Sequence, residues 1–282
     1  MHTISNEVSL VDQNLNDNTL LLAIRLAGGN STLTILMADN NQLTHRGIKL
    51  LISQFSLTSL SVNFNKIDDD GLIALTALRT LVVLEIGNNV ITDKGVAAFN
   101  EASNLKHLAL HGNNITDKSL EYIARISTLE ILNIANAHVS DSGIIYLIKC
   151  KNLKRLNAKD NYITDAGANL LAKMPLSVLN IKFNNLTDKG AYLLALNTNI
   201  KLLKILCKAI SDKCESIIRE NDPIKITNAA RKFGLKNSVP TLKAIGIFRI
   251  KSYLPNQTPH NDLSKVLPND LIVDITTVKY II

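Results

Sequence analysis

Apolar and polar residues follow a template that repeats along this chain about every 24 residues. The clearest copy starts at Leu81, reads L-x-x-L-x-L-x-x-N-x-I, and continues with Thr92, Asp93 and Gly95. Seven further frames keep this register, and they start at Leu33, Leu57, Leu105, Leu129, Leu153, Leu176 and Ile200. Self-similarity at this period indicates a solenoid, in which stacked units share one core because no single unit can bury its own leucines.

Each frame predicts a short strand, a turn and a helix. Apolar residues two apart share one face of a strand, and the residues between them face the other way. Thr or Asp before a small residue and a run of apolar residues at helical spacing marks a helix start. Asn suits the turn because its amide can satisfy open backbone groups. This Asn recurs in six frames, as Asn41, Asn65, Asn89, Asn113, Asn161 and Asn184. We expect a curved array with strands inside and helices outside, and a glycine after the Asp that lets adjacent helices approach.

The same pattern divides the chain into three segments. Residues 1–32 hold a partial frame, which we interpret as an N-terminal capping repeat. Residues 33–220 form an array of eight units, and the last unit puts Lys208 at the Asn position and Cys214 at the Gly position. Asn-Asp-Pro at residues 221–223 interrupts the pattern, so residues 221–282 are predicted to be a separate helical segment. Near this boundary the sequence predicts helices over residues 212–220 and 224–237.

The template resembles leucine-rich repeats whose convex side is helical, as in ribonuclease inhibitor and the repeat arrays of F-box proteins. The resemblance covers residues 33–211, and I-T-D-x-G is its most specific piece. It implies an α/β fold, a leucine-rich repeat solenoid with parallel strands on the concave face and helices on the convex face. The period is shorter than in those relatives, so the likeness concerns architecture. The resemblance further implies non-catalytic protein binding, as in bacterial leucine-rich repeat effectors that act inside host cells.

Composition narrows the setting of such a protein. The net charge of +7 is spread along the chain and favours acidic partners. Three scattered cysteines fit a reducing compartment better than a disulfide framework. The first residues lack the basic and apolar regions of a secretory signal peptide. No apolar run reaches the roughly 20 residues of a membrane span. We therefore expect a soluble protein without a classical signal peptide. The resemblance to bacterial effectors implies synthesis in a bacterial cytoplasm and export into a host cytosol.

The strand residues that do not enter the core are predicted to form the binding surface on the concave face. The early part of this surface is neutral to acidic, and the later part is polar and basic. Phe64 and Phe183 occupy equivalent positions at the edge of the turn and are candidate apolar anchors, because aromatic residues are favoured at binding hot spots. The full candidate set is Phe64, Glu85, His107, His111, Asn133, Arg155, Asn157, Lys159, Asn180, Lys182, Phe183 and Lys204.

No motif for catalysis, nucleotide binding or metal binding is present in the sequence. His107 and His111 share one strand face, but four residues of extended chain separate them by about 13 Å, which is too far to share a metal. Cys207 could serve as a nucleophile in the manner of secreted bacterial ubiquitin ligases that carry such repeats. About 70 residues after the array cannot supply their catalytic domain, so Cys207 and Cys214 are interpreted as core residues. We expect no enzyme activity and no cofactor.

The C-terminal tail resembles the SOCS box, a helical module that docks substrate receptors on elongin B/C and a cullin. Its first helix carries S/T-L-x-x-x-C-x-x-x-I, which Thr241 and Leu242 begin to match, although Gly246 stands in place of the Cys. The resemblance implies docking through Leu242, Ile245, Ile250, Leu254, Leu267, Pro268 and Leu271. Two alternatives stay open for the same residues. The stretch from Leu267 to Leu271 also looks like the opening of an F-box, and the whole tail could be a helical cap on the last repeat.

Three functions are compatible with this sequence. The first is a protein-interaction module that acts as a bacterial effector, with the possible added role of a substrate receptor that recruits a target to a host elongin and cullin ligase. The second is a regulator that caps an enzyme, as ribonuclease inhibitor does. The third is binding of an acidic polymer or a nucleic acid along residues 155–204, which is disfavoured because few cations and no aromatic platform line that strip.

Overall fold

The computed structural model describes residues 6–99 and 103–235. Within them, strands and helices alternate along the chain, and repeat n consists of strand βn and helix αn. The strands are β1 (Glu7–Ser9), β2 (Ile35–Met37), β3 (Ser59–Ser61), β4 (Val83–Glu85), β5 (His107–Ala109), β6 (Ile131–Asn133), β7 (Arg155–Asn157), β8 (Val178–Asn180) and β9 (Leu202–Lys204). The helices are α1 (Asp17–Leu26), α2 (His45–Gln54), α3 (Asp69–Leu75), α4 (Asp93–Val96), α5 (Asp117–Ile123), α6 (Asp141–Leu147), α7 (Asp165–Leu171), α8 (Asp188–Ala195), α9 (Asp212–Glu220) and α10 (Pro223–Arg231).

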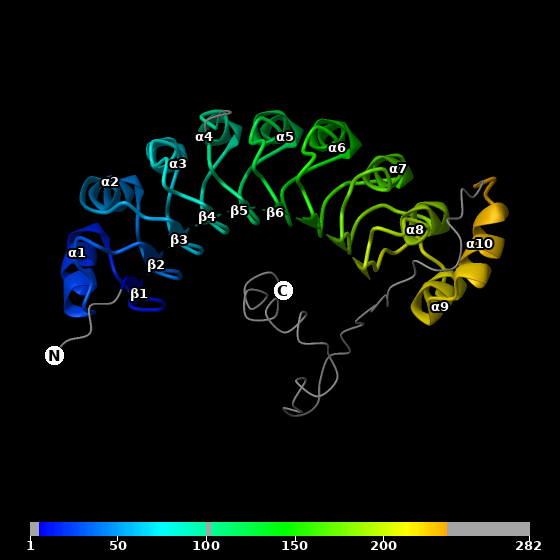
Figure 1. Cartoon of the computed structure of the whole chain (residues 1–282), viewed down its shortest axis with the longest axis horizontal. Coiled ribbons are helices and arrows are strands. Elements are labelled where there is room, and N and C mark those ends of the chain that lie inside the picture. The colour runs from blue at the N-terminus through cyan, green and yellow to red at the C-terminus, as the bar shows by residue number, and fades with distance from the viewer. Residues whose placement is uncertain (1–5, 100–102, 236–282) are drawn as a thin grey trace, which may run out of the picture. The chain divides into compact units, whose positions relative to one another are not determined.

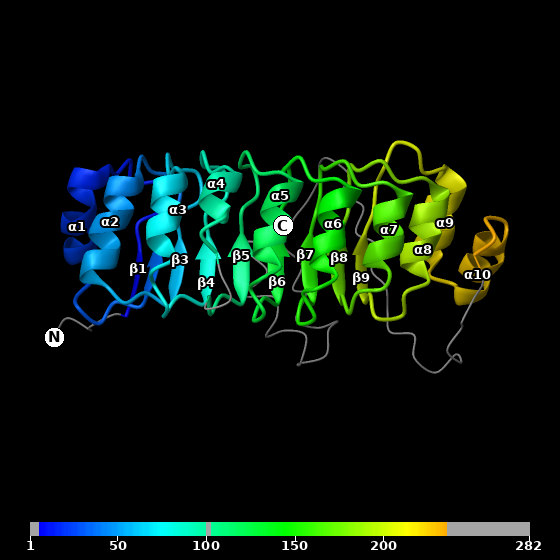
Figure 2. The same cartoon turned by 90° about the horizontal axis from the view of Figure 1, so that it is seen from above.

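The strands form one parallel sheet in chain order from β1 to β9. Each strand pairs with the next in a register of one repeat, so that Leu60, Leu84 and Leu108 lie side by side. Figure 1 shows the array in profile, with the strands along the inner side of the curve and the helices along the outer side. Figure 2 shows the same row from above. This α/β leucine-rich repeat architecture confirms the fold predicted from the template.

The core lies between the sheet and the helices. Every repeat contributes the Leu or Ile residues of its template, and most of these are fully buried, as Leu84, Ile86 and Ile91 are in repeat 4. Burial of such a side chain stabilises the fold by about 1.5–3 kcal/mol. Because the template side chains stack on those of the two neighbouring repeats, the core is continuous along the array.

A ladder of asparagines, most of them buried, closes the turns after β2, β3, β4, β5, β7 and β8. Asn113 shows the pattern: its amide nitrogen donates to the carbonyl oxygens of Ile86 and Leu110, at 2.9 and 3.0 Å, and its amide oxygen accepts from the Ile91 N–H at 3.1 Å. Each Asn therefore ties its repeat to the repeat before it. Repeat 6 has Ala137 at this position.

Repeat 9 differs from the sequence expectation at the same turn. The frame puts Lys208 at the Asn position, but Lys208 is exposed and Cys207 is buried there instead. The Cys207 thiol donates to the carbonyl oxygen of Ile181 at 3.6 Å, which is the contact that an Asn amide makes in the other repeats. The prediction for Lys208 is wrong because this turn reaches its inward position one residue earlier than the template does.

A second ladder joins the helix starts. The carboxylate of Asp93 accepts from both the N–H and the hydroxyl of Thr116 in the next repeat, at 2.9 and 2.7 Å. The glycine near each helix start is needed because the carboxylate packs against it: a Cβ on Gly190 would lie 2.2 Å from the Asp165 carboxylate. The helices approach closely at this glycine, as predicted. Repeat 2 has a histidine in place of the Asp, and the ring of His45 lies 3.0 Å from the Asp68 carboxylate.

Both ends of the array carry elements beyond the regular template. Residues 1–32 include strand β1, in register with β2, and helix α1, so this segment contains a repeat of its own. Helix α9 has the predicted bounds. Helix α10 follows at once and packs on α8 and α9, but it runs over Pro223–Arg231 and so ends six residues before the predicted end at residue 237. Ile226 and Ala230 of α10 are buried, and the Phe233 ring lies 5.8 Å from that of Tyr192. Helix α10 thus covers the outer side of the last repeats.

Candidate binding surface

The inner face of the sheet consists of the strand side chains that point away from the core. Its first part, in repeats 2–5, is a polar network in which the side chains satisfy one another. The Asp39 carboxylate accepts from the Ser61 hydroxyl and the Asn63 N–H, each at 2.7 Å. The Asn63 amide donates to the Glu85 carboxylate at 3.3 Å. Between 7 and 9% of each of these four residues is exposed, so little of their polar surface is left for a partner.

Two histidines extend this network. His107 is buried, and its Nε2 lies 3.7 Å from Glu85 Oε1, which is too long for a hydrogen bond. Burial, aided by the positive charge of Arg155, lowers the pKa of His107 to about 4, so the ring is uncharged at neutral pH. His111 lies against Gly87, and its Nδ1 is 3.2 Å from the Asn133 amide nitrogen. Burial also lowers the pKa of His111 and raises that of Glu85.

The sequence predicts that Glu85, His107 and Asn133 face the solvent, and the structure contradicts this. Only 8, 7 and 5% of these residues are exposed, respectively. The reason is the sheet itself. Adjacent parallel strands lie about 4.8 Å apart, so that polar side chains on neighbouring strands cover each other. Their proposed role in direct contact with a partner has no support from their exposure.

The second part of the inner face, in repeats 7–9, is partly exposed and basic. We call Arg155, Lys159, Lys182 and Lys204 the basic strip. Each of them is intermediate in exposure. The amides of Asn157 and Asn180 accept the backbone N–H groups two residues on, at 3.3 and 3.4 Å. These amides therefore form hydrogen bonds within the turns that follow β7 and β8.

Phe64 and Phe183 occupy equivalent turns in repeats 3 and 8. Both are exposed, by 56 and 49%, and both have the left-handed backbone conformation, with φ of 54° and 58°. A bulky residue is uncommon in this region because its Cβ crowds the carbonyl oxygen. The sequence locates both residues at the edge of the turn, but it gives no sign of the backbone conformation.

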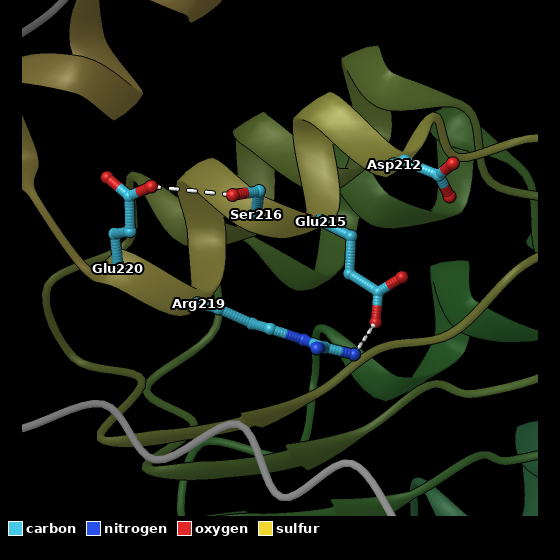
Figure 3. Close-up of a pocket in the computed structure, with 5 residues that line it drawn as sticks. All are labelled: Asp212, Glu215, Ser216, Arg219 and Glu220. Atoms are coloured by element: carbon cyan, nitrogen blue, oxygen red, sulfur yellow. Dashed lines mark hydrogen bonds and ion pairs between the residues drawn. The ribbon is translucent and has the colours of Figure 1, made fainter.

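A pocket on helix α9 and the titratable side chains elsewhere in the described residues give weaker indications of a binding site. The pocket in Figure 3 is lined by Asp212, Glu215, Ser216, Arg219 and Glu220 of helix α9, and the charged groups of Arg219 and Glu215 pair with each other. No cluster of His, Cys, Asp or Glu among residues 6–99 and 103–235 is arranged to hold a metal ion.

The three cysteines are buried, as interpreted from the sequence. Burial raises the pKa of the Cys150 thiol to about 11 and that of Cys214 to about 12, and it raises the pKa of Cys207 as well. A nucleophilic cysteine requires the thiolate, and these environments oppose it. The predicted docking residues of the tail, Leu242, Ile245, Ile250, Leu254, Leu267, Pro268 and Leu271, lie outside the described residues. Docking on elongin B/C and a cullin stays a prediction.

The family model described as Leucine Rich repeat matches five stretches of the chain. They cover residues 53–75, 77–99, 101–124, 126–147 and 173–195. Each stretch contains one strand and the helix that follows it, so the matches coincide with repeats 3, 4, 5, 6 and 8 of the structure. The chain is a leucine-rich repeat protein.

Three solved structures are similar to this chain at low sequence identity. Internalin C2 of Listeria monocytogenes is 22% identical over 70% of this chain and 75% of its own, with a TM-score of 0.46. A leucine-rich repeat protein of Leptospira interrogans is 20% identical over 68% of this chain and 54% of its own, with the same TM-score of 0.46. The plant peptide hormone receptor RGFR1, in complex with RGF2, is 16% identical over 67% of this chain, with a TM-score of 0.40.

This leucine-rich repeat protein spans only part of two of the proteins that it resembles. It spans about a third of the plant receptor and about half of the Leptospira protein. No curated protein matches its sequence. Leucine-rich repeat arrays are generally non-catalytic modules that bind other proteins. None of the helices within residues 6–99 and 103–235 is long and apolar enough to cross a membrane. The effector role stays a prediction from sequence resemblance.

Proposed function

We propose that this leucine-rich repeat protein binds a protein partner without catalysis, and that the basic strip receives an acidic segment of that partner. The observation that carries the proposal is the division of the inner face. In repeats 2–5 the side chains of Asp39, Ser61, Asn63 and Glu85 are buried and form hydrogen bonds within one network, whereas in repeats 7–9 the cations are partly exposed. A partner gains little from polar groups that are already satisfied, so the second part is the favoured contact surface.

The chemistry of the strip favours an acidic protein segment. Arg155 lies on β7 and Lys204 on β9, whereas Lys159 and Lys182 lie in the turns after β7 and β8, and these strands are paired in register. Adjacent strands are about 4.8 Å apart, and an extended peptide rises about 3.3 Å per residue. One strand spacing therefore corresponds to about one and a half residues, so a segment that crosses the strands with an acidic side chain at every first or second residue can reach successive cations. Electrostatic complementarity of this kind sets specificity and speeds association.

A charge-reversal experiment tests the proposal. The double variant Arg155→Glu with Lys159→Glu is compared with Lys118→Glu with Lys189→Glu, which makes the same change of charge on exposed helix positions of the outer side. Proteins captured by each variant from a lysate are quantified by mass spectrometry. We expect partners that the wild type and the outer-side variant retain and the inner-face variant loses. The proposal is wrong if the inner-face variant retains them all.

Three further measurements distinguish loss of binding from loss of folding and a protein partner from a nucleic acid. Thermal unfolding followed by circular dichroism checks that Arg155→Glu, at a half-buried position, leaves the array folded. The variant Lys159→Glu with Lys182→Glu repeats the test without Arg155. A single-stranded oligonucleotide serves as a second ligand, because binding to phosphates weakens steeply as salt is added. Tight, salt-sensitive binding of the oligonucleotide would replace the protein partner with a nucleic acid.

A further inference from the structure

Phe183 stands at a turn position that selects against it. The equivalent residues of repeats 2, 4, 6 and 7 also have positive φ, between 52° and 57°, and they are Asn40, Asn88, Asn136 and Asp160. Repeat 5 has Gly112 there, with φ of 65°. These are the residue types that tolerate the left-handed region. The turn therefore has no need of a phenylalanine. Strain at such a position points to a role outside the turn itself.

The ring of Phe183 also contributes little to the core, because about half of the residue is exposed. Its contacts lie toward the inner face. Lys159 Nζ lies 5.2 Å from the centroid of the ring, in a cation–π arrangement. The Phe183 N–H donates to the carbonyl oxygen of Leu206 at 2.7 Å, and Leu206 is itself 42% exposed. Phe183 and Leu206 are thus two exposed apolar residues that are joined through their backbones, and Lys182 of the basic strip is next to Phe183 in the chain.

We propose that Phe183 and Leu206 form an anchor point for an aromatic or aliphatic side chain that an acidic partner segment carries. This inference rests on the proposed function and names the chemistry of the partner more closely. Lys159 holds the ring and meets the acidic groups of the segment, so one side chain serves both kinds of contact. Exposed aromatic residues beside charged groups are favoured as hot spots of protein interfaces.

The surrounding charges give the segment a direction. Asp160 is exposed at the position equivalent to Phe183 in the preceding repeat. It repels a carboxylate on that side, whereas Lys182 and Lys204 attract one on the other. The acidic residues of the partner are therefore expected to meet Lys159, Lys182 and Lys204, away from Asp160, with the apolar residue over Phe183.

Phe64 provides an internal control for this inference. It has the same backbone conformation at the same turn and a similar exposure. Its surroundings differ, because Asn40 and Asn88 occupy the equivalent turns on either side and the acidic network of Asp39 and Glu85 lies in repeats 2–4. An acidic segment has no favourable charge to meet there. A change of Phe64 should leave the binding of such a segment intact.

The test selects random peptides of about 12 residues, displayed on phage, against the full-length protein; extended, such peptides span about 40 Å, enough to cross repeats 7–9. We expect enriched peptides that combine several Asp or Glu residues with a Phe, Trp or Leu.

The affinities of synthetic copies of these peptides are then measured by fluorescence anisotropy for the wild type and for the variants Phe183→Asn and Phe64→Asn. Asn is the natural residue at this turn, so both variants are expected to fold, which circular dichroism checks. Phe183→Asn should weaken binding at least about tenfold, the effect of one hot-spot residue, and Phe64→Asn should leave the affinity within about twofold of the wild type.

The outcomes separate this inference from the proposed function. Acidic peptides that bind through Arg155 and Lys159 but lack an apolar residue, and that Phe183→Asn does not weaken, would overturn the anchor and leave the basic strip in place. Equal losses from Phe64→Asn and Phe183→Asn would also overturn the anchor, because the effect would then not depend on the basic strip. Enrichment without acidic residues, or no enrichment at all, would overturn both.

Discussion

Asn113 and Asn114 are adjacent in the turn of repeat 5 and allow a sharp test of the asparagine ladder. The buried Asn113 side chain makes hydrogen bonds to Ile86, Leu110 and Ile91, whereas Asn114 is exposed and its N–H bonds to the Ile91 carbonyl oxygen. Asn113→Ala removes all three side-chain bonds and leaves two to three buried backbone groups without a partner. Each such group costs about 1–3 kcal/mol, so we expect a loss of about 3 kcal/mol or more in the free energy of unfolding.

The measurement is urea unfolding followed by far-ultraviolet circular dichroism, with thermal unfolding in parallel. A loss of about 3 kcal/mol corresponds to a fall in Tm of roughly 6–12 °C for an array of this size. Asn114→Ala makes the same substitution one residue away and should stay within about 0.5 kcal/mol of the wild type. The reasoning is refuted if Asn113→Ala loses less than about 1 kcal/mol, or no more than Asn114→Ala.

Three further predictions follow from buried positions. Ala137→Asn should install the missing member of the asparagine ladder and raise the unfolding free energy by about 1 kcal/mol; a loss of stability in urea unfolding would show that repeat 6 has closed around the smaller side chain. His107 has a folded pKa of about 4 and an unfolded pKa near 6.5, so the unfolded state binds the proton more readily and stability falls as the pH drops from about 6.5 to about 4, by up to about 3 kcal/mol. His107→Gln should remove most of that fall, and an unchanged pH profile of unfolding would contradict the assignment. Because burial raises the pKa of Cys150, Cys207 and Cys214, iodoacetamide should label them slowly in the native protein and quickly in urea; rapid native labelling of any one would identify a reactive thiol.

Most of the fold is predictable from the sequence because the template occurs eight times along the chain. The spacing of Leu81, Leu84 and Ile86 implies a strand, and Thr92 and Asp93 imply a helix start, which the structure places at Thr92 as the N-cap and Asp93 as the first residue of α4. Where the template weakens, the prediction fails. Cys207 can replace an Asn amide only as a thiol donor, and nothing in the frame shows that the turn is one residue shorter.

The candidate surface was less predictable than the fold. The alternation of the strand identifies which side chains leave the core, and this holds for Glu85 and His107 as it does for Lys159. The alternation does not show how much of a side chain its neighbours on adjacent strands cover. That exposed fraction depends on residues about 24 positions away in the sequence. The short Ser61 and Asn63 and the carboxylates beside them close into a network, whereas long lysines do not. The left-handed backbone conformation of Phe183 is also not predictable from that residue alone. The geometry of the turn imposes it, although a phenylalanine side chain disfavours it.

Ala137 has a mechanical consequence for the whole array. Between repeats 5 and 6 the strand pairing remains, and so does the contact of Ser140 with Asp117 at the helix starts, but the tie through the middle of the turn is missing. A stack whose units touch only their nearest neighbours bends where one coupling is softest. The curve of the array should therefore open and close about this joint, which lies between the acidic network and the basic strip.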